Sequence, residues 1–136
     1  MAAELSDAAV ALLRGPFFAT VSTFRKDGTI QSVITWADVD EAGRNVLLNT
    51  AEGRAWWHNL RRDPRVTVTV AGAGHREFLS VTGRVVEMTH DGADAHIDAL
   101  ERTYTGFPEY RGRALWPEHV RTTIVIEPDR VSHYGG

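Results

Sequence analysis

Residues 49–70, NTAEGRAWWHNLRRDPRVTVTV, contain a strand end, a tight turn, a short helix and the start of another strand. We expect the helix over residues 54–62 and its end at Asp63-Pro64, because proline cannot continue a helix. A helix N-terminus presents unpaired backbone N–H groups and a partial positive charge. Thr50 and Arg54 at that position therefore predict a phosphate-binding site.

The residue types alone also allow a structural interpretation of this turn. Thr50 would then be an N-cap, Arg54 a solvated helix residue, and the two tryptophans that follow it core residues. We interpret Asn59 and the pair Arg61-Arg62 as surface and capping residues that support the helix.

Strand patterns lie on both sides of this segment. Val66, Val68 and Val70 alternate with threonines, which is typical of a half-buried antiparallel strand. Gly83 interrupts a long strand pattern and predicts a bulge or a barrel corner. The expected strands cover residues 17–23, 29–37, 44–49, 66–70, 77–88, 121–126 and 130–134.

Helices are expected over residues 7–13, capped by Ser6, over 54–62 and over 91–104, with an irregular aromatic loop over 105–119. Together these elements predict a mainly β protein of the α+β class, a small antiparallel barrel of six or seven strands with two or three helices. We expect one domain over residues 1–136. In the strand over residues 29–37, alternate side chains point to opposite faces, so one face is expected to be core and the other a ligand wall.

Composition excludes several classes of protein. The chain has no cysteine, so disulfides, thiolate metal sites and cysteine nucleophiles are excluded. A net charge of −3 argues against non-specific nucleic-acid binding. No apolar run is long enough to span a bilayer, and the N-terminal residues have helical rather than signal-peptide spacing, so we expect a cytoplasmic protein that does not bind membranes.

The common catalytic motifs do not fit either. The histidines at 58, 75, 90, 96, 119 and 133 form no metal-binding motif, so we expect no metal and interpret them as solvated or capping residues. Ser80 lies within a strand and outside a GxSxG elbow. Gly72 and Gly74 do not complete a dinucleotide-binding fingerprint. No residue is assigned a catalytic role.

Taken in order, FFATVST, KDGT, IQSVITW, VLLNT, AEGRAWWHNLRRDPRV and FLSVTGRV resemble the pyridoxamine 5′-phosphate oxidase-like split β-barrel family, and within it the deazaflavin (coenzyme F420)-dependent reductases. The resemblance extends from Leu12 to Val131, and the run TAEGRAWWHNLRRDPRV is its most specific part. It implies a homodimer with a flavin or deazaflavin site at the subunit interface.

The resemblance also implies roles for individual residues. The ring would lie against residues 31–35, the ribityl and phosphate oxygens would meet the strand-to-helix turn, and the following sheet would approach the ring. The partner subunit would lend residues from the segment 105–121. The implied site residues are Gln31, Ser32, Val33, Ile34, Thr35, Asn49, Thr50, Arg54, Ser80, Trp116 and Arg121. One position departs from the family pattern: Trp56 stands where relatives commonly have a phosphate-facing lysine.

The expected function is that of an oxidoreductase that transfers a hydride from reduced F420 to a small conjugated acceptor. Trp36, Trp56 and the aromatics of residues 105–119 would form an apolar wall over the ring. One alternative is an FMN-binding pyridoxamine-phosphate-oxidase-like enzyme or flavin reductase. The other is a non-catalytic cofactor- or haem-binding module, which the tryptophan at position 56 keeps open.

Overall fold

A computed structural model describes residues 2–74 and 76–135, so His75 lies outside the described residues. The elements follow one another as α1 (Asp7–Leu13), β1 (Ala19–Phe24), β2 (Ile30–Thr35), β3 (Ala37–Val39), β4 (Val46–Ala51), α2 (Ala55–Arg62), β5 (Arg65–Ala71), β6 (Phe78–Thr89), α3 (Ala93–Thr105), α4 (Gly112–Leu115) and β7 (Arg121–Tyr134).

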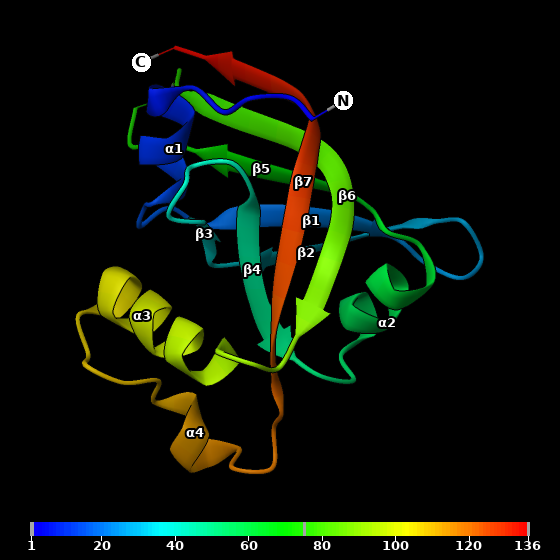
Figure 1. Ribbon diagram of the computed structural model, residues 1–136, viewed down its shortest axis with the longest axis vertical. Coiled ribbons are helices and arrows are strands. Elements are labelled where there is room, and N and C mark those ends of the chain that lie inside the picture. Colours follow the sequence, from blue (N-terminus) through cyan, green and yellow to red (C-terminus); the bar gives the residue numbers. More distant parts are fainter. Residues whose placement is uncertain (1, 75, 136) are drawn as a thin grey trace.

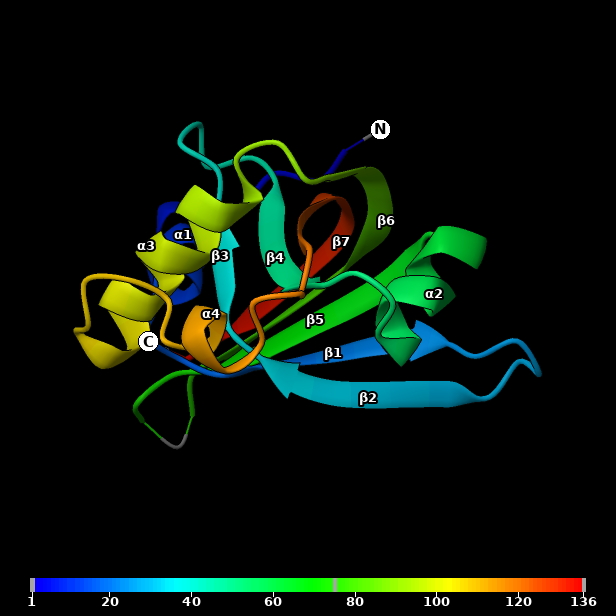
Figure 2. The same ribbon diagram turned by 90° about the horizontal axis from the view of Figure 1, so that it is seen from below.

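All these strands belong to one seven-stranded sheet with the order β2-β1-β5-β6-β7-β4-β3. Every neighbouring pair is antiparallel. The sheet curls, so that β1 and β5 face β4 and β7 across the interior (Figures 1 and 2). This architecture confirms the predicted mainly β class and the small antiparallel split barrel.

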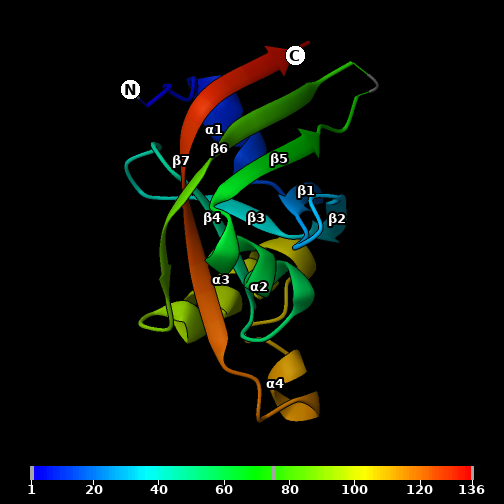
Figure 3. The ribbon, with the colours of Figure 1, turned by 90° about the vertical axis from the view of Figure 1, so that its right-hand side faces the viewer.

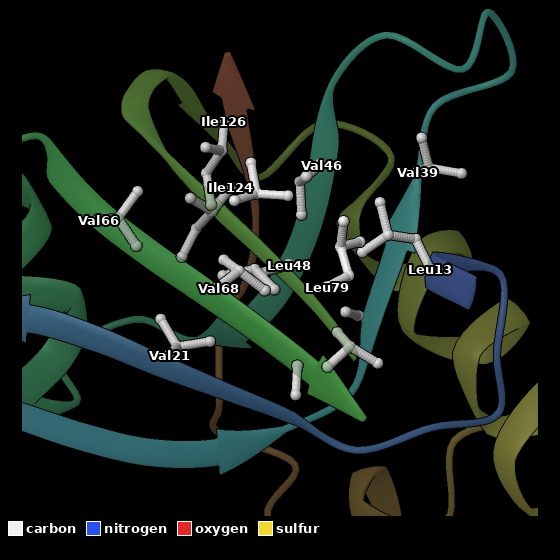
Figure 4. Packing of buried hydrophobic residues seen from close by; sticks show 14 of the residues in the cluster. Leu13, Val21, Val39, Val46, Leu48, Val66, Val68, Leu79, Ile124 and Ile126 are labelled. Carbon is white, nitrogen blue, oxygen red and sulfur yellow. The ribbon is translucent and has the colours of Figure 1, made fainter. Parts of the chain in front are cut away.

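The interior of the curled sheet is filled by branched aliphatic side chains. Val21 and Val68 lie on one wall and Leu48, Ile124 and Ile126 on the other (Figure 4), and all five are fully buried. Val21 and Val68 are flanked by hydroxyl residues, and Ile124 and Ile126 are two positions apart, which matches the period of two expected for strands with one buried face. The hydrophobic core therefore lies inside the barrel and leaves the ends of the strands free to carry polar side chains.

The helices cover the ends of the barrel. Ser6 caps α1 by accepting a hydrogen bond from the backbone N–H of Ala9 at 3.1 Å, as the sequence predicts. Helix α1 and both termini lie at one end of the molecule and α4 at the other (Figure 3). No helix of the described chain is both long and apolar enough to cross a membrane.

Three element predictions were wrong. The expected strand over residues 29–37 is divided into β2 and β3 at Trp36, and the strands expected at 121–126 and 130–134 are the single strand β7. The described chain has four helices rather than two or three, because residues 112–115 of the expected loop form the one-turn helix α4.

The pairing of β6 with β7 contains a bulge at Gly83, as the interior glycine predicts. Thr82 pairs with Arg130 and Gly83 with Pro128, so one residue of β7 is left over between the two pairs. Proline is tolerated there because a bulge does not need its missing N–H. A Cβ atom on Gly83 would overlap the carbonyl oxygen of Glu127, so only glycine fits at this position.

Candidate functional site

A cavity of about 620 Å³ opens beside the turn between β4 and α2. Its walls come from β2, β4, α2, α3, the start of β7 and the segment after α3; Figure 2 shows α2 and α3 on either side of β4. Most of the predicted site residues line this cavity, namely Gln31, Val33, Ile34, Thr35, Asn49, Thr50, Arg54, Trp56 and Arg121. Segments far apart in the sequence therefore meet where a single small-molecule site was expected.

Arg121 is the most unusual of these residues. It is only 7% exposed, yet none of the described carboxylates lies within ion-pair distance of its guanidinium. Its Nε donates to Asn49 Oδ1 at 2.9 Å, and the guanidinium lies over the ring of Tyr110, 4.9 Å from the centroid. Burial lowers the pKa of Arg121, and the charge of Arg54 lowers it further. Tyr110 and Asp94 oppose this shift in pKa, but none of the described carboxylates pairs directly with the guanidinium. An arginine stays protonated at neutral pH, so the cavity contains a buried positive charge without an ion-pair partner among the described residues.

The first turn of α2 adds positive potential to the same cavity. Arg54 is the N-cap residue, its side chain makes no capping hydrogen bond, and no acidic residue occupies the first turn. Arg54, Ala55 and Trp56 all line the cavity. The unpaired backbone N–H groups of this turn and the two guanidinium groups therefore form a site suited to an anion.

Two buried polar residues connect β4 to this anion site. Asn49 and Thr50 are 4% and 3% exposed and pair with Thr123 and Thr122 of β7. Asn49 contacts Arg121 directly, whereas Thr50 lines the cavity beside the α2 turn. The strand end is thus polar because it faces the cavity, while Leu48 just before it belongs to the core.

Strand β2 supplies the opposite wall of the cavity. Gln31, Val33 and Thr35 are half-buried, whereas Ile30 and Ile34 are 62% and 73% exposed. The expectation of a core face is confirmed only in part: Val33 packs against the core and Ala37 belongs to it, whereas the face with Ile30 and Ile34 is exposed. The half-buried face lines the cavity, and Ile34 from the exposed face also borders it.

Asn59 holds one residue of that wall in place. The sequence suggests a surface role for it, but Asn59 is 6% exposed and donates to Thr23 Oγ1 at 3.1 Å and to Gln31 Oε1 at 2.8 Å. Because the carbonyl oxygen of the Gln31 amide is occupied in this way, its NH₂ group remains available to the cavity. The surface interpretation of Asn59 was wrong, and the residue orients the cavity wall.

Aromatic side chains form the apolar part of the cavity. Trp36 and Trp56 line it as expected, together with Phe18 and Tyr110. Trp36 stacks on Tyr104, with ring centroids 5.0 Å apart and an interplanar angle of 17°. A flat conjugated ring is the kind of ligand that such walls accommodate.

Tyr104 fixes the break between β2 and β3. Its hydroxyl donates to the carbonyl oxygen of Phe17 at 2.7 Å and accepts from the backbone N–H of Ala37 at 3.0 Å. Burial raises the pKa of Tyr104, so the hydroxyl stays protonated and keeps its donor role. This contact explains why the strand expected over residues 29–37 ends early.

Three predicted site residues do not line the cavity. Ser32 is on the outer face of β2 and is hydrogen-bonded to Ser22 at 2.9 Å. Ser80 is in the middle of β6, between Thr69 and Ser132. Trp116 is 45% exposed and stacks on the imidazole of His119. Trp116 and Arg121 were expected to come from a partner subunit, but Arg121 lines the cavity of its own chain.

The sequence analysis included Tyr110 only as one of the aromatic residues of 105–119 expected to form a wall over the ring, and it is the one of them that lines the cavity. Two carboxylates of α3 hold this loop: Asp98 accepts from the backbone N–H of Tyr110 at 2.8 Å, and Glu101 from that of Arg111 at 2.9 Å. Burial raises the pKa of Glu101, but hydrogen bonds from Thr105 and Arg111 outweigh it, so the pKa is below its ordinary value. The carboxylates fix Tyr110 beside Arg121.

Glu101→Ala is expected to lower the free energy of unfolding by about 1–3 kcal/mol, because it leaves the N–H of Arg111 without its acceptor. Glu101→Gln keeps an amide oxygen for that N–H, and its NH₂ group can donate to Thr105 Oγ1, which in the wild type donates to Glu101 Oε2 at 2.6 Å. It loses the pair with the exposed Arg111 guanidinium at 3.6 Å, so it should cost less than about 1 kcal/mol. Urea unfolding of both variants measures the difference. Equal losses would show that the charge of Glu101 matters, and not its hydrogen bonds.

Two apolar residues of α3, Ile97 and Leu100, also line the cavity. Their helical spacing marks a buried face, but it does not distinguish a core from a ligand wall.

Among the described residues, no three histidine, aspartate or glutamate side chains form a group that could hold a metal ion. The cavity lining contains arginines, amides, hydroxyls and aromatic rings, which suit a conjugated ligand with an anionic group.

A family profile described as "Pyridoxamine 5′-phosphate oxidase" matches residues 5–134. The match covers nearly the whole chain, including all the elements around the cavity. A comparison with curated proteins finds no match.

Solved structures with the same fold are numerous. An F420 reductase is 25% identical over 94% of this chain and 98% of its own, with a TM-score of 0.77. A conserved hypothetical protein from Mycobacterium tuberculosis is 21% identical over 96% of this chain and 84% of its own, with a TM-score of 0.75. General stress protein 26 from Bacillus anthracis is 16% identical over 91% of this chain and 88% of its own, with a TM-score of 0.66.

Proposed function

Because the chain belongs to the pyridoxamine 5′-phosphate oxidase family, we propose that it is an oxidoreductase that binds coenzyme F420 in this cavity and reduces a small conjugated organic acceptor. The observation that carries the proposal is the buried guanidinium of Arg121, which has no carboxylate partner among the described residues and shares the cavity with Arg54. A buried guanidinium without an ion-pair partner among the described residues, close to the exposed Arg54 and an uncapped helix N-terminus, favours binding of an anion.

The phosphate of the cofactor would lie at this positive end. Arg54, Arg121, the hydroxyl of Thr50 and the first N–H groups of α2 are the groups that would hold it. The inner face of β2 and the Trp36 ring would hold the conjugated ring system. When bound, a reduced deazaflavin supplies a hydride, and the protein supplies orientation and electrostatics.

The described cavity lining includes no carboxylate, histidine or lysine. The acceptor, having taken up a hydride, would therefore receive its proton from water or from the hydroxyl of Tyr110. The role of this chain would be to hold the ring and the acceptor together and to keep them apart from bulk water on the side of Trp36 and Trp56.

Two cofactors, F420 and FMN, are candidates for the ligand of this cavity. The similarity to an F420 reductase supports F420, whereas the family as a whole supports FMN. Trp56 replaces the lysine that relatives commonly have, but Arg121 supplies a second cation from β7 and makes up for its absence. Fluorescence titration of the purified protein with F420 and with FMN tests the choice. Submicromolar FMN binding without F420 binding would move the proposal to an FMN-dependent enzyme.

The third possibility is a module that binds a cofactor without turning it over. A bound, reduced cofactor that a panel of conjugated acceptors reoxidises faster than buffer does would support the enzyme. Reoxidation at the buffer rate across the panel would favour the non-catalytic module. Haem binding can be followed in the same preparation by its absorption spectrum.

We also propose a homodimer with the cofactor at the subunit interface. The mouth of the cavity is flanked by Phe18 and Ile34, which line it and are 66% and 73% exposed. Neighbouring apolar side chains of this size that remain exposed mark a surface for another protein. Light scattering after size-exclusion chromatography should give twice the mass of the chain, and Ile34→Lys should shift that mass toward the monomer.

Arg54→Ala is expected to weaken binding of F420 and FMN roughly tenfold, the value of one charge-assisted hydrogen bond at a partly solvated site. The affinity for riboflavin, which lacks the phosphate, should not change. Isothermal titration with FMN and with riboflavin measures both. Arg61→Ala is the matched control, because Arg61 is on the same helix but lies over the Trp57 ring outside the cavity. Unchanged FMN affinity in Arg54→Ala would show that the turn is only structural.

A further inference from the structure

A row of polar side chains behind the cavity connects Arg121 to a histidine that does not line it. Arg121 Nε donates to Asn49 Oδ1 at 2.9 Å, and Asn49 Nδ2 is 3.2 Å from His96 Nδ1. His96 Nε2 is in turn 3.3 Å from Asp38 Oδ2, close enough for an ion pair but without hydrogen-bond geometry. The row joins β7, β4, α3 and β3, and its two central members are nearly buried.

The Asn49 amide can take only one orientation in this row. Its NH₂ group donates to the carbonyl oxygen of Ala93 at 3.0 Å, a group that can only accept. Its oxygen accepts from Arg121 Nε, a group that can only donate. A flipped amide would set donor against donor at Arg121 and acceptor against acceptor at Ala93. The second N–H of the amide must therefore point to His96.

This orientation defines the state of the imidazole. Because Asn49 offers an N–H to His96 Nδ1, that nitrogen must carry a lone pair, and the proton of the neutral ring is on Nε2, facing Asp38. Thr123 Oγ1 is 3.4 Å from the same Nδ1 and can also donate to it. His96 and the carbonyl oxygen of Ala93 are therefore the two acceptors of this buried amide.

We propose that His96 is a positioning residue for Arg121: together with the carbonyl oxygen of Ala93 it accepts the two N–H groups of the Asn49 amide, which strengthens the orientation with the Asn49 oxygen toward Arg121 Nε and so holds the guanidinium in place for an anionic ligand group. The proposal rests on the proposed function, because it assigns Arg121 to the phosphate end of the cofactor. Arginine has many rotamers, and fixing it before the ligand arrives removes that entropy from the cost of binding.

A ligand-free measurement tests the row itself. In ¹⁵N-labelled protein near pH 8, the His96 ring should show the tautomer protonated at Nε2, and the Arg121 Nε–H should give a signal protected from exchange with water. His96→Asn places an amide oxygen near the position of Nδ1 and should preserve the Arg121 signal. His96→Leu removes the acceptor and should lose it. An Nδ1-protonated ring in the wild-type protein would overturn the proposal, even where a variant fails to fold.

Binding of two probes tests the consequence. His96→Leu should weaken the binding of FMN roughly three- to tenfold, a typical effect of losing one buried hydrogen bond, and leave the affinity for riboflavin unchanged. His96→Asn should restore FMN affinity. In the Arg121→Gln background, His96→Leu should have no further effect on FMN. Equal losses for FMN and riboflavin, or an unchanged loss in that background, would reduce His96 to an ordinary structural residue.

The two proposals fail in different ways. A wild-type protein that binds neither F420 nor FMN would overturn the proposed function, while the tautomer of His96 and the protected Arg121 signal would still decide the positioning row. A wild-type protein that binds FMN with an exchange-broadened Arg121 signal would retain the function and overturn the role of His96.

Discussion

Gly83→Ala is expected to lower the free energy of unfolding by roughly 2–4 kcal/mol. A Cβ at this position would overlap the carbonyl oxygen of Glu127, a backbone atom on the paired strand β7, so it cannot be relieved by rotating a side chain. The strands would have to separate at the bulge, where β6 and β7 bend together (Figure 1). Urea or guanidinium unfolding followed by circular dichroism measures the loss.

Gly74→Ala is the matched control for this prediction. Among the described residues, nothing lies within 4 Å of a Cβ built on Gly74, and its backbone is not in the left-handed region, so the substitution should be neutral or slightly stabilising. If both variants unfold at the same denaturant concentration, the close approach at Gly83 has no energetic weight and the two strands can adjust to a methyl group.

Local sequence patterns predicted the strands of the barrel because each has one buried face. The alternation of Val66, Val68 and Val70 is an example, and these three valines are buried in β5. The same reasoning divided β7 in two, and Pro128 lies in the gap between the two expected strands. Its pairing with Gly83 at the bulge is a property of two strands together, and no window on either strand contains it.

The candidate site shows the same limit. Thr50 and Arg54 could be predicted because a strand end, a turn and a helix start are adjacent in the chain. Asn59 and His96 could not, because an isolated polar residue on a helix has no periodic signal, and which face of the helix is buried depends on packing against distant strands. The two residues to which Asn59 donates are 36 and 28 positions away in the sequence.

Arg121→Gln is expected to weaken the binding of phosphate-bearing flavins roughly a hundredfold, the upper end of the value of a charge-assisted hydrogen bond. The upper end applies because the side chain of Arg121 is nearly buried, at 7% exposed. The ligand-free protein should be as stable as the wild type or more stable, because the substitution removes a buried charge that has no carboxylate partner among the described residues. Glutamine can still donate to Asn49 Oδ1 and so preserves the neighbouring contact. Titration with FMN and thermal unfolding of the ligand-free protein measure the two effects.

The opposite signs of these effects separate a ligand-binding arginine from a structural one. A structural Arg121 would lower stability when replaced and would weaken FMN and riboflavin alike, whereas an anion-binding Arg121 costs stability in the free protein and recovers it only with a phosphate in place. Arg130→Gln is the control on the same strand, since Arg130 is exposed on β7 and does not line the cavity. A loss of stability in Arg121→Gln with unchanged FMN affinity would contradict the assignment, because the buried charge would then be balanced within the fold and not by a ligand.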